Sequence, residues 1–392
     1  MKVRKIDGNE RFDAYLISMY CFHGRIDDVE SERERVENEN LEDWGAFTDE
    51  GKLVARIVNN KYKFYLDGCA VRSGGIGAVS TLPEYRELGA VKEIFKTLLP
   101  EAYKDGEIIS TLFPFNHEFY RKQGYEVVTF QSNYELDPAL LHGYKFKGCV
   151  TRWTPGESIT EFLSIYNEFA KNYNFAMLRD EESMLEHMKV DKLYQERKFS
   201  YIFSRDGKKI AYIIFTDIKN DPAAILHVEE SAWINRDGFY AILAFLGRFE
   251  ADYGNIELPL PHGIDLLRII RTPRAYEIHK TSRHDFMVRV INAKKLLEII
   301  NKPFDCDFII KISDEVISEN NQVLHVKYDS VEIVDENSVP DIEVSERALV
   351  QMAVGCINLD EAMLRMDVTV NAKEKILRET FIEKKIYVGE HF

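Results

Sequence analysis

An arginine and a glycine three residues apart, Arg86 and Gly89, stand where the sequence changes from a strand pattern to a helix pattern. Residues 76–81 read as a strand, and Pro83, which has no N–H to donate, ends its pairing. Apolar side chains then recur at helical spacing, so residues 85–89 are predicted to begin a helix. Free N–H groups and the positive end of the helix dipole suit a phosphate or pyrophosphate there. Many helices begin this way without a ligand, so the spacing alone leaves both possibilities open.

Two segments resemble motifs of the GNAT acyltransferases. The first, Pro83-Glu-Tyr-Arg86-Glu-Leu-Gly89-Ala90, resembles motif A, a Gln/Arg-x-x-Gly-x-Gly/Ala loop that holds the pyrophosphate of coenzyme A in that family. The second, Phe119-Tyr120-Arg121-Lys122-Gln123-Gly124-Tyr125-Glu126, is similar to a segment of the Eis-like (enhanced intracellular survival) branch. Chains of that branch are about this long and also end in Phe, so the resemblance extends over essentially the whole chain.

The resemblance implies an acetyl-CoA-dependent N-acetyltransferase that acetylates a primary amine of aminoglycoside, polyamine or lysine type by direct attack. It also implies that Tyr120 is the general acid and that the C-terminal carboxylate of Phe392 is the general base. Without the resemblance, Tyr120 would be a core aromatic residue and residue 392 a frayed terminus. No Cys or Ser stands in a nucleophile context, which favours direct attack over a covalent intermediate. The alternative is a non-catalytic protein that binds an apolar ligand in its C-terminal domain.

The cofactor site is carried over from the family by motif. The backbone of residues 79–81 would pair with the pantetheine arm as an added strand, and residues 86–91 would cradle the pyrophosphate. The resemblance also implies that the N–H of Val79 faces the thioester oxygen. The predicted cofactor-binding residues are Val79, Ser80, Thr81, Arg86, Glu87, Leu88, Gly89, Ala90, Val91 and Asn116. Glu87 and Leu88 replace residues that are usually basic in the family. This departure puts the affinity for the cofactor in doubt more than the identity of the cofactor.

An acidic segment, residues 27–43, holds nine carboxylates against two arginines. Such a segment has too little apolar surface to pack well, so a solvated helix or loop is its simplest interpretation. In the GNAT fold this region lies beside the acceptor site, where it could attract a cationic amine. The predicted acceptor residues are therefore Asp28 and the flanking aromatic residues Phe22 and Trp44, although both aromatics would also suit an ordinary core.

The composition excludes several classes of protein. The 392 residues include 51 Lys and Arg against 66 Asp and Glu, a net charge of −15. That charge repels nucleic acid and attracts cationic substrates, although it also serves solubility. Five scattered cysteines without a Cys-x-x-Cys pair argue against a disulfide framework or a metal site. With neither a signal peptide nor a membrane span in the sequence, we expect a cytoplasmic protein; the resemblance implies a homohexamer.

The length predicts more than one domain, and a weak internal repeat supports this. The pattern from Phe47 to Gly51-Lys52 recurs 156 residues later from Phe203 to Gly207-Lys208. The second copy lacks the Arg-x-x-Gly spacing, so it is expected to be degenerate. Residues 286–291 alternate like an edge strand, and the rest of the chain resembles a sterol-carrier-protein-like domain. We therefore predict an α+β (mixed α/β) fold with two tandem GNAT-like domains, 1–147 and 148–284, and a C-terminal domain, 285–392.

Overall fold

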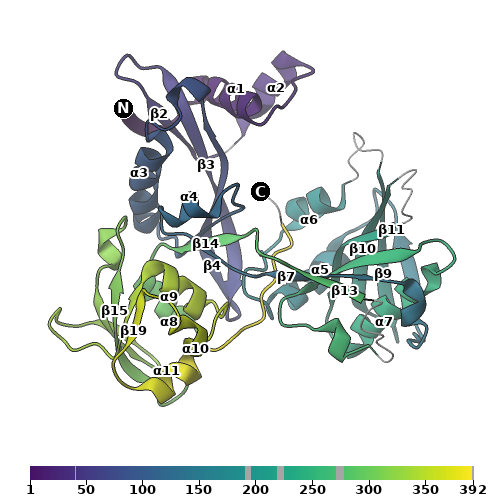
Figure 1. The fold of residues 1–392 in the computed structure, drawn as a ribbon. Coiled ribbons are helices and arrows are strands. Elements are labelled where there is room, and N and C mark those ends of the chain that lie inside the picture. The colour runs from purple at the N-terminus through teal and green to yellow at the C-terminus, as the bar shows by residue number, and fades with distance from the viewer. Residues whose placement is uncertain (40, 190–195, 219–224, 271–277, 391–392) are drawn as a thin grey trace.

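The computed structural model describes residues 1–39, 41–189, 196–218, 225–270 and 278–390. Within these residues the strands form three sheets, two of seven strands and one of five. Figure 1 shows the first sheet at the upper left, the second at the right and the third at the lower left. The predicted mixed α/β class is confirmed. Every helix in the described part of the chain is too short or too polar to cross a membrane.

The first sheet has the order β1-β2-β3-β4-β5-β14-β6. Its strands are β1 (Lys2–Lys5), β2 (Asp43–Phe47), β3 (Leu53–Leu66), β4 (Cys69–Thr81), β5 (Ile109–Leu112), β14 (Met287–Val290) and β6 (Glu126–Val127). The first four are antiparallel neighbours, β4 and β5 are parallel, and β14 is antiparallel to both β5 and β6. The chain turns at residues 67–68, between the end of β3 and the start of β4.

The second sheet repeats that order with other strands. It runs β13-β7-β12-β11-β10-β9-β8, and its one parallel pair, β11 with β12, corresponds to β4 with β5. The strands are β7 (Gln131–Leu136), β8 (Cys149–Trp153), β9 (Glu196–Arg205), β10 (Lys208–Ile218), β11 (Ile225–Trp233), β12 (Asn255–Pro261) and β13 (Ile278–Arg283). Gly51 and Gly207, the glycines of the sequence repeat, stand in equivalent hairpins, and both have positive φ.

The two sheets exchange strands. β14 comes late in the sequence but lies inside the first sheet, and β7, which precedes most of the second sheet in sequence, lies inside the second. The prediction of an edge strand over residues 286–291 is therefore wrong, because β14 pairs with β5 on one side and with β6 on the other. The alternating pattern suggested an edge strand because an arginine such as Arg289 ordinarily faces solvent. In the structure Arg289 is fully buried and paired with Asp314 (Nη2 to Oδ1, 2.7 Å).

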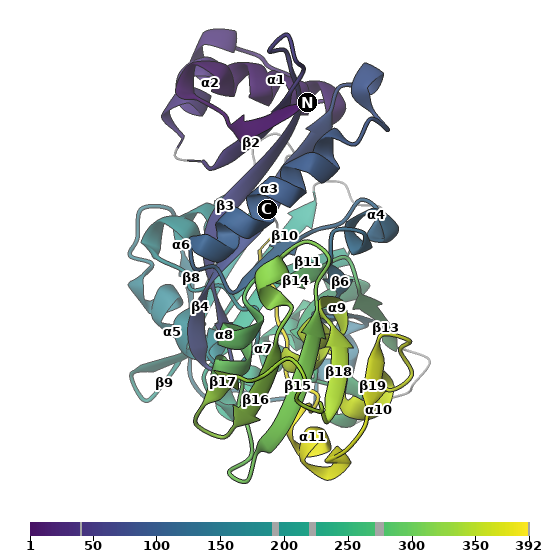
Figure 2. The ribbon, with the colours of Figure 1, turned by 90° about the vertical axis from the view of Figure 1, so that its left-hand side faces the viewer.

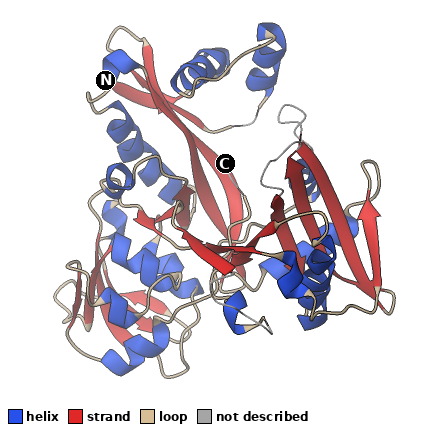
Figure 3. Cartoon of the chain, turned by 45° about the vertical axis from the view of Figure 1, so that its right-hand side comes forward, coloured by secondary structure: helices blue, strands red, loops and turns tan. Residues whose placement is uncertain are grey.

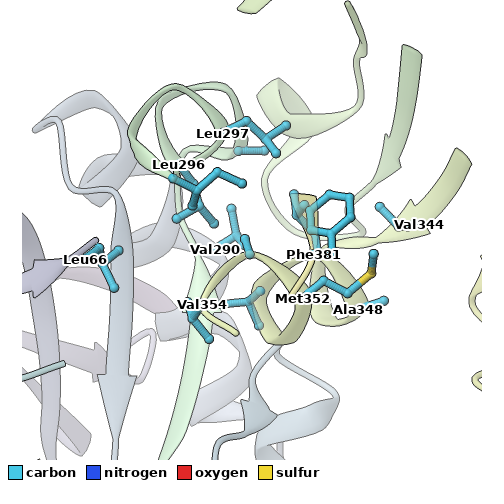
Figure 4. Packing of buried hydrophobic residues seen from close by; sticks show 14 of the residues in the cluster. Leu66, Val290, Leu296, Leu297, Val344, Ala348, Met352, Val354 and Phe381 are labelled. Atoms are coloured by element: carbon cyan, nitrogen blue, oxygen red, sulfur yellow. The ribbon is translucent and has the colours of Figure 1, made fainter. Parts of the chain in front are cut away.

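The third sheet, β17-β16-β15-β18-β19, completes the chain. Its strands are β15 (Asp307–Ser313), β16 (Val323–Lys327), β17 (Val331–Ile333), β18 (Ile342–Ser345) and β19 (Val368–Val370). Figure 4 shows part of the apolar cluster that joins this layer to the first sheet: Leu66 of β3 and Val290 of β14 lie on the side of Leu296, while Phe381 and Met352 pack on the other. The predicted boundaries at 147 and 284 remain a prediction.

Helices cover the faces of these sheets. They are α1 (Arg11–Cys21), α2 (Val29–Asn38), α3 (Ala90–Lys104), α4 (His117–Arg121), α5 (Thr160–Ala170), α6 (Glu181–Met188), α7 (Arg236–Leu246), α8 (Ala293–Ile299), α9 (Glu346–Ala353), α10 (Leu359–Ala362) and α11 (Glu374–Thr380). Short 3₁₀ turns lie at Gly8–Glu10, Pro83–Tyr85, Pro138–Leu141, Gly247–Phe249, Leu266–Arg268 and Ser318–Asn320. Figure 2 shows α3 lying along the first sheet, and Figure 3 shows α1 and α2 on its opposite side.

Candidate active site

The site begins where β4 runs on past the end of β5. The two strands pair from Ser73 with Ile109 to Ile76 with Leu112, and β4 then continues to Thr81. Within the described residues, the edge of β4 over residues 77–81 therefore has no neighbouring strand on that side. Such an edge offers backbone N–H and C=O groups that a ligand can pair with as an added strand.

A bulge in β4 shapes this free edge. Arg56 of β3 lies opposite Ser80 and Val58 lies opposite Gly77, so β4 holds one extra residue between these pairs. Within the bulge, Ala78 adopts the left-handed backbone conformation, with a φ of +49°. The Ser80 hydroxyl contacts the Ser18 hydroxyl of α1 at 3.1 Å, which turns this side chain toward α1 and leaves its backbone at the edge.

The N-terminus of α3 closes one end of the same groove. Its N-cap is Gly89, with φ +81° and no side chain to satisfy the first N–H groups. Those N–H groups and the helix dipole therefore remain available to an anion. Two cationic side chains, Arg86 and Lys92, and one carboxylate, Glu87, line this end. Arg86 donates from Nε to the Thr81 carbonyl (3.4 Å), which holds its side chain over the end of β4.

These elements enclose a groove of about 520 Å³. It is lined by every predicted cofactor-binding residue except Leu88 and Asn116, and by the predicted acceptor residue Phe22. Leu88 is exposed and does not line the groove. Asn116 is the N-cap of α4, and its Oδ1 accepts the N–H of Phe119 at 3.0 Å. The structure thus brings the motif A residues and the strand residues 79–81 together.

Tyr120 lies beside this groove in a cluster of aromatic rings. Its ring centroid lies 5.1 Å from that of Phe119, 5.3 Å from that of Phe115 and 6.3 Å from that of Phe95. Phe115 and Phe119 themselves line the groove, so Tyr120 is one side chain away from it. Burial raises the pKa of the Tyr120 phenol above its ordinary value, so the hydroxyl keeps its proton at neutral pH.

The other predicted residues lie elsewhere. Trp44 is buried in the core cluster of the first sheet, and its Nε1 donates to Glu42 at 2.9 Å. Asp28 caps α2 by accepting the N–H groups of Glu30 and Ser31. The acidic segment is thus in part an exposed helix, as its composition predicted. Phe392 lies outside the described residues.

Sequence reasoning missed several residues that line the groove. Phe115, Phe119, Tyr85 and Lys92 are among them, and so is Cys21, whose Sγ lies 3.3 Å from the Thr81 carbonyl oxygen. Cys21 is the last residue of α1 and directly precedes Phe22. The same reasoning that placed Phe22 near the site could therefore have placed Cys21 there.

Comparisons with known proteins agree with this geometry. Residues 2–128 match the family model for the acetyltransferase (GNAT) domain, a match that ends with β6. No curated protein matches the sequence. Among solved structures, a GCN5-related N-acetyltransferase from Anabaena variabilis is 19% identical with a TM-score of 0.85, and each chain is covered to 100%. Eis1 from Mycobacterium abscessus is 17% identical with a TM-score of 0.84, again with 100% of both chains covered.

A conserved protein of unknown function from Enterococcus faecalis is also similar, with 18% identity, a TM-score of 0.87 and coverage of 100% of this chain and 99% of that one. At such identities the likenesses establish the fold. Residues 2–128 are thus similar in sequence to an acetyltransferase domain of the GNAT class. The whole chain has the fold of Eis1, which confirms the resemblance to Eis-like proteins at the level of structure.

Proposed function

We propose that this protein is an N-acetyltransferase that moves the acetyl group of acetyl-CoA to a primary amine by direct attack. The observation that carries the proposal is the groove itself. Within the described residues, the edge of β4 over residues 77–81 is unpaired, and it is followed after a short turn by the uncapped N-terminus of α3 at Gly89. That combination matches a ligand with a peptide-like arm and a pyrophosphate, as in coenzyme A.

The residues present fit such a cofactor. The backbone of Val79 to Thr81 would hold the amide-rich arm, and the N–H groups from Gly89 to Val91 would hold the pyrophosphate, with Arg86 and Lys92 nearby. Glu87 is exposed, so its repulsion of a phosphate is screened and costs about 1 kcal/mol or less. Acetyl-CoA bound there supplies the acetyl group as a thioester, and the products are an N-acetyl amine and free CoA.

Two groups of this chain would move the protons. As the new C–N bond forms and the C–S bond breaks, the amine loses a proton and the leaving sulfur gains one. Tyr120, protonated at neutral pH and next to the groove, is the proposed donor to sulfur. The carboxylate of Phe392 is the proposed acceptor of the amine proton. A free α-carboxylate has a pKa of about 3.5, so this role requires burial or a nearby negative charge.

The proposed acceptor carries a cationic amine, of aminoglycoside, polyamine or lysine type. The net charge of −15 supports this, since a negative field raises the local concentration of cations. Helix α2 adds to that field, because most of its carboxylates are exposed and it packs beside α1, whose end lines the groove with Cys21. Phe22, with about 60% of its surface exposed at the groove, is the proposed apolar contact for the acceptor.

The experiment is to measure free-thiol release from saturating acetyl-CoA with a panel of aminoglycosides, polyamines and lysyl peptides. The proposal predicts turnover with at least one class, together with mass spectrometric detection of the acetylated amine. Thiol release without an acetylated amine would indicate simple hydrolysis. Absence of turnover across the panel, combined with absence of CoA binding, would contradict the proposal.

A further inference from the structure

A second cleft, of about 640 Å³, lies between helix α4 and the third sheet. One side is lined by α4 and the turn that follows it, and the other by the segments that follow β15 and β18 and by the start of α9. Figures 1 and 2 both show α4 lying above α9. Among the described residues, none that lines this α4–α9 cleft also lines the groove beside β4. The cleft is therefore separate from the candidate active site.

The α4–α9 cleft lies at the carboxyl ends of two parallel strands. β15 and β18 pair in parallel from Ile310 with Ile342 to Ser313 with Ser345, and α9 begins directly after β18. Crevices at the carboxyl ends of parallel strands commonly bind ligands, because the chain leaves the sheet there in loops and helix N-termini. The cleft therefore has the placement of a ligand site.

The cationic side chains that line the cleft are already matched by carboxylates. Two of them belong to α4 and the turn after it, and the third lies in the first turn of α9. The pairs are Arg121 with Glu126 (2.9 Å), Lys122 with Glu118 (3.1 Å) and Arg347 with Asp367 (3.9 Å). These cations are therefore poorly suited to hold an anionic ligand.

Glu346, the first residue of α9, is a lining carboxyl group without such a match. Only 7% of its surface is exposed. Within the described residues, its own N–H is the one hydrogen-bond donor to its carboxyl, and no ion pair reaches it. The nearby Arg289 is engaged with Asp314, to which its Nη1 and Nη2 donate at 3.0 and 2.7 Å. A buried carboxylate without a counterion is costly, so a cation beside Glu346 would be stabilised.

The remaining carboxylate of the lining, Glu315, is exposed, and within the described residues it also lacks an ion pair. The unmatched charges of the cleft are thus negative. A metal ion does not fit them, since the described part of the chain contains no group of three His, Cys, Asp or Glu side chains placed to hold one. An ammonium group does fit, because it needs only one carboxylate to form a charge-assisted hydrogen bond.

We propose that the α4–α9 cleft binds an organic cation with primary ammonium groups, one of which pairs with Glu346 and another with Glu315. The proposal does not rest on acetyl transfer, and it gives this cleft a ligand of its own. The ligand would lie against α4, the helix that also carries Tyr120.

Binding of such a cation is linked to the ionisation of Glu346. Burial raises the pKa of Glu346 to about 7, and Asp314 adds to this while Arg289 and Arg347 oppose it. An ammonium group with a pKa of about 10 stays charged from pH 6 to pH 8. Since the cation favours the ionised carboxylate, binding at pH 7 should release about half a proton per ligand. For the same reason, the affinity should rise by about 10-fold from pH 6 to pH 8.

The test is a calorimetric titration of the full-length protein with putrescine, a diammonium compound, at low salt and without acetyl-CoA. Titrations in two buffers of different ionisation enthalpy give the number of protons released, and titrations at three pH values give the change in affinity. The neutral analogue 1,4-butanediol has the same carbon chain and should not bind.

Three variants separate the contributions. Glu346→Gln keeps the shape of the side chain, and it should weaken putrescine binding by about 10- to 100-fold and abolish the proton release. Glu315→Gln removes an exposed charge, so it should weaken binding by only about 2- to 5-fold and keep the proton release. Glu181→Gln makes the same change at the exposed first residue of α6, outside the cleft, and should leave both quantities unchanged.

The proposal is overturned if wild-type protein does not bind putrescine, or if it binds 1,4-butanediol as tightly. It is also overturned if Glu346→Gln, shown by circular dichroism to be folded, releases the same number of protons as the wild type. Putrescine bound only at the proposed acceptor site would give that last result, since Glu346 does not line the groove. Failure of the amine panel to show acetylation would contradict the proposed function and leave this binding site in place.

Discussion

Tyr120 owes its chemical character to the rings that surround it. Phe95, Phe115 and Phe119 exclude water from most of its surface, and burial keeps its hydroxyl protonated. The neighbouring Tyr125 is still more buried, but its hydroxyl is bound to that of Ser110 at 2.7 Å. Of these two phenols, Tyr120 contacts the groove-lining rings of Phe115 and Phe119, whereas Tyr125 is engaged with Ser110.

Replacing Tyr120 with Phe should lower kcat by about 10²- to 10⁴-fold, the usual effect of losing a positioned general acid. The ring packing is kept, so CoA affinity should not change. Stopped-flow or steady-state thiol release measures kcat, and calorimetry measures CoA binding.

Tyr125→Phe is the matched control in the same cluster. It removes one buried hydrogen bond and should cost about 1 kcal/mol of unfolding free energy with kcat near the wild-type value. If both variants lose kcat equally, the assignment of Tyr120 as the acid does not hold.

At the scale of elements, the difference between two helix N-termini predicts where an anion would bind. Both α3 and α7 follow a strand that outruns its parallel neighbour, yet only α3 lacks a side-chain cap. A positive φ at Gly89 makes that open terminus possible, since other residues adopt it at a cost of roughly 1–2 kcal/mol.

Gly89→Ala should therefore weaken CoA binding by about 10-fold or more, because the added methyl group would enter the space that a phosphate needs. Its own structural cost comes only from backbone strain, since no protein atom lies within 4 Å of the added carbon. Gly207→Ala has the same two properties in the second sheet and serves as the control. Equal CoA affinities for the two variants, measured by calorimetry, would argue against the cradle.

At the N-terminus of α9, the titration of a buried carboxyl group should make the stability of the protein depend on pH. Burial raises the pKa of Glu346, its first residue, to about 7, and Asp314 adds to this while Arg289 and Arg347 oppose it. The helix dipole also favours a carboxylate there, but desolvation is the larger effect. A carboxyl group whose pKa is raised on folding favours the folded state below its unfolded pKa of about 4.5, and that stability is lost as pH rises through about 7.

Glu346→Gln should therefore flatten the pH dependence. Its unfolding free energy should match that of the wild type near pH 4.5 and exceed it by up to about 3 kcal/mol above pH 8. Urea unfolding at both pH values gives the comparison. A variant that is equally destabilised at both would show that the carboxylate is well accommodated.

The whole molecule is tied together by the exchange of β7 and β14, and local sequence patterns could not reveal this. The hairpin glycines, the helix after Gly89 and most of the groove lining were predictable, because they depend on neighbouring residues or on motif. The strand between β5 and β6 comes from a segment more than 150 residues away in the sequence. An alternating pattern of apolar residues predicts a strand but not which strand it pairs with. Arg289 reads as solvent-exposed until its partner Asp314 is known.

The same reasoning explains why the buried ionic cluster of Arg179, Glu230 and Glu390 was missed. Arg179, Glu230 and Glu390 are spread over more than 200 residues, and nothing in the spacing of a lone Arg or Glu predicts burial. Acidic and basic residues are ordinarily exposed, so only the three-dimensional pairing identifies these as a buried set.

Strand exchange predicts that residues 1–147 do not fold alone. They lack β14, whose Met287, Val288 and Val290 are fully buried between β5 and β6. The isolated fragment should show rapid amide exchange and no cooperative thermal transition. Mixing it with residues 148–392 should restore both, and cooperative unfolding of the fragment by itself would contradict the prediction.

The most direct test of the account is a calorimetric titration of the full-length protein with CoA. We expect one site per chain. Within the described residues, the first sheet has an open helix N-terminus beside an unpaired strand edge. In the second sheet, Asn235 caps α7, and residues 387–389 line the cleft beside β11. Binding of one CoA per chain that is weakened by Gly89→Ala would support it. Two sites per chain, or one that is insensitive to Gly89→Ala, would contradict it.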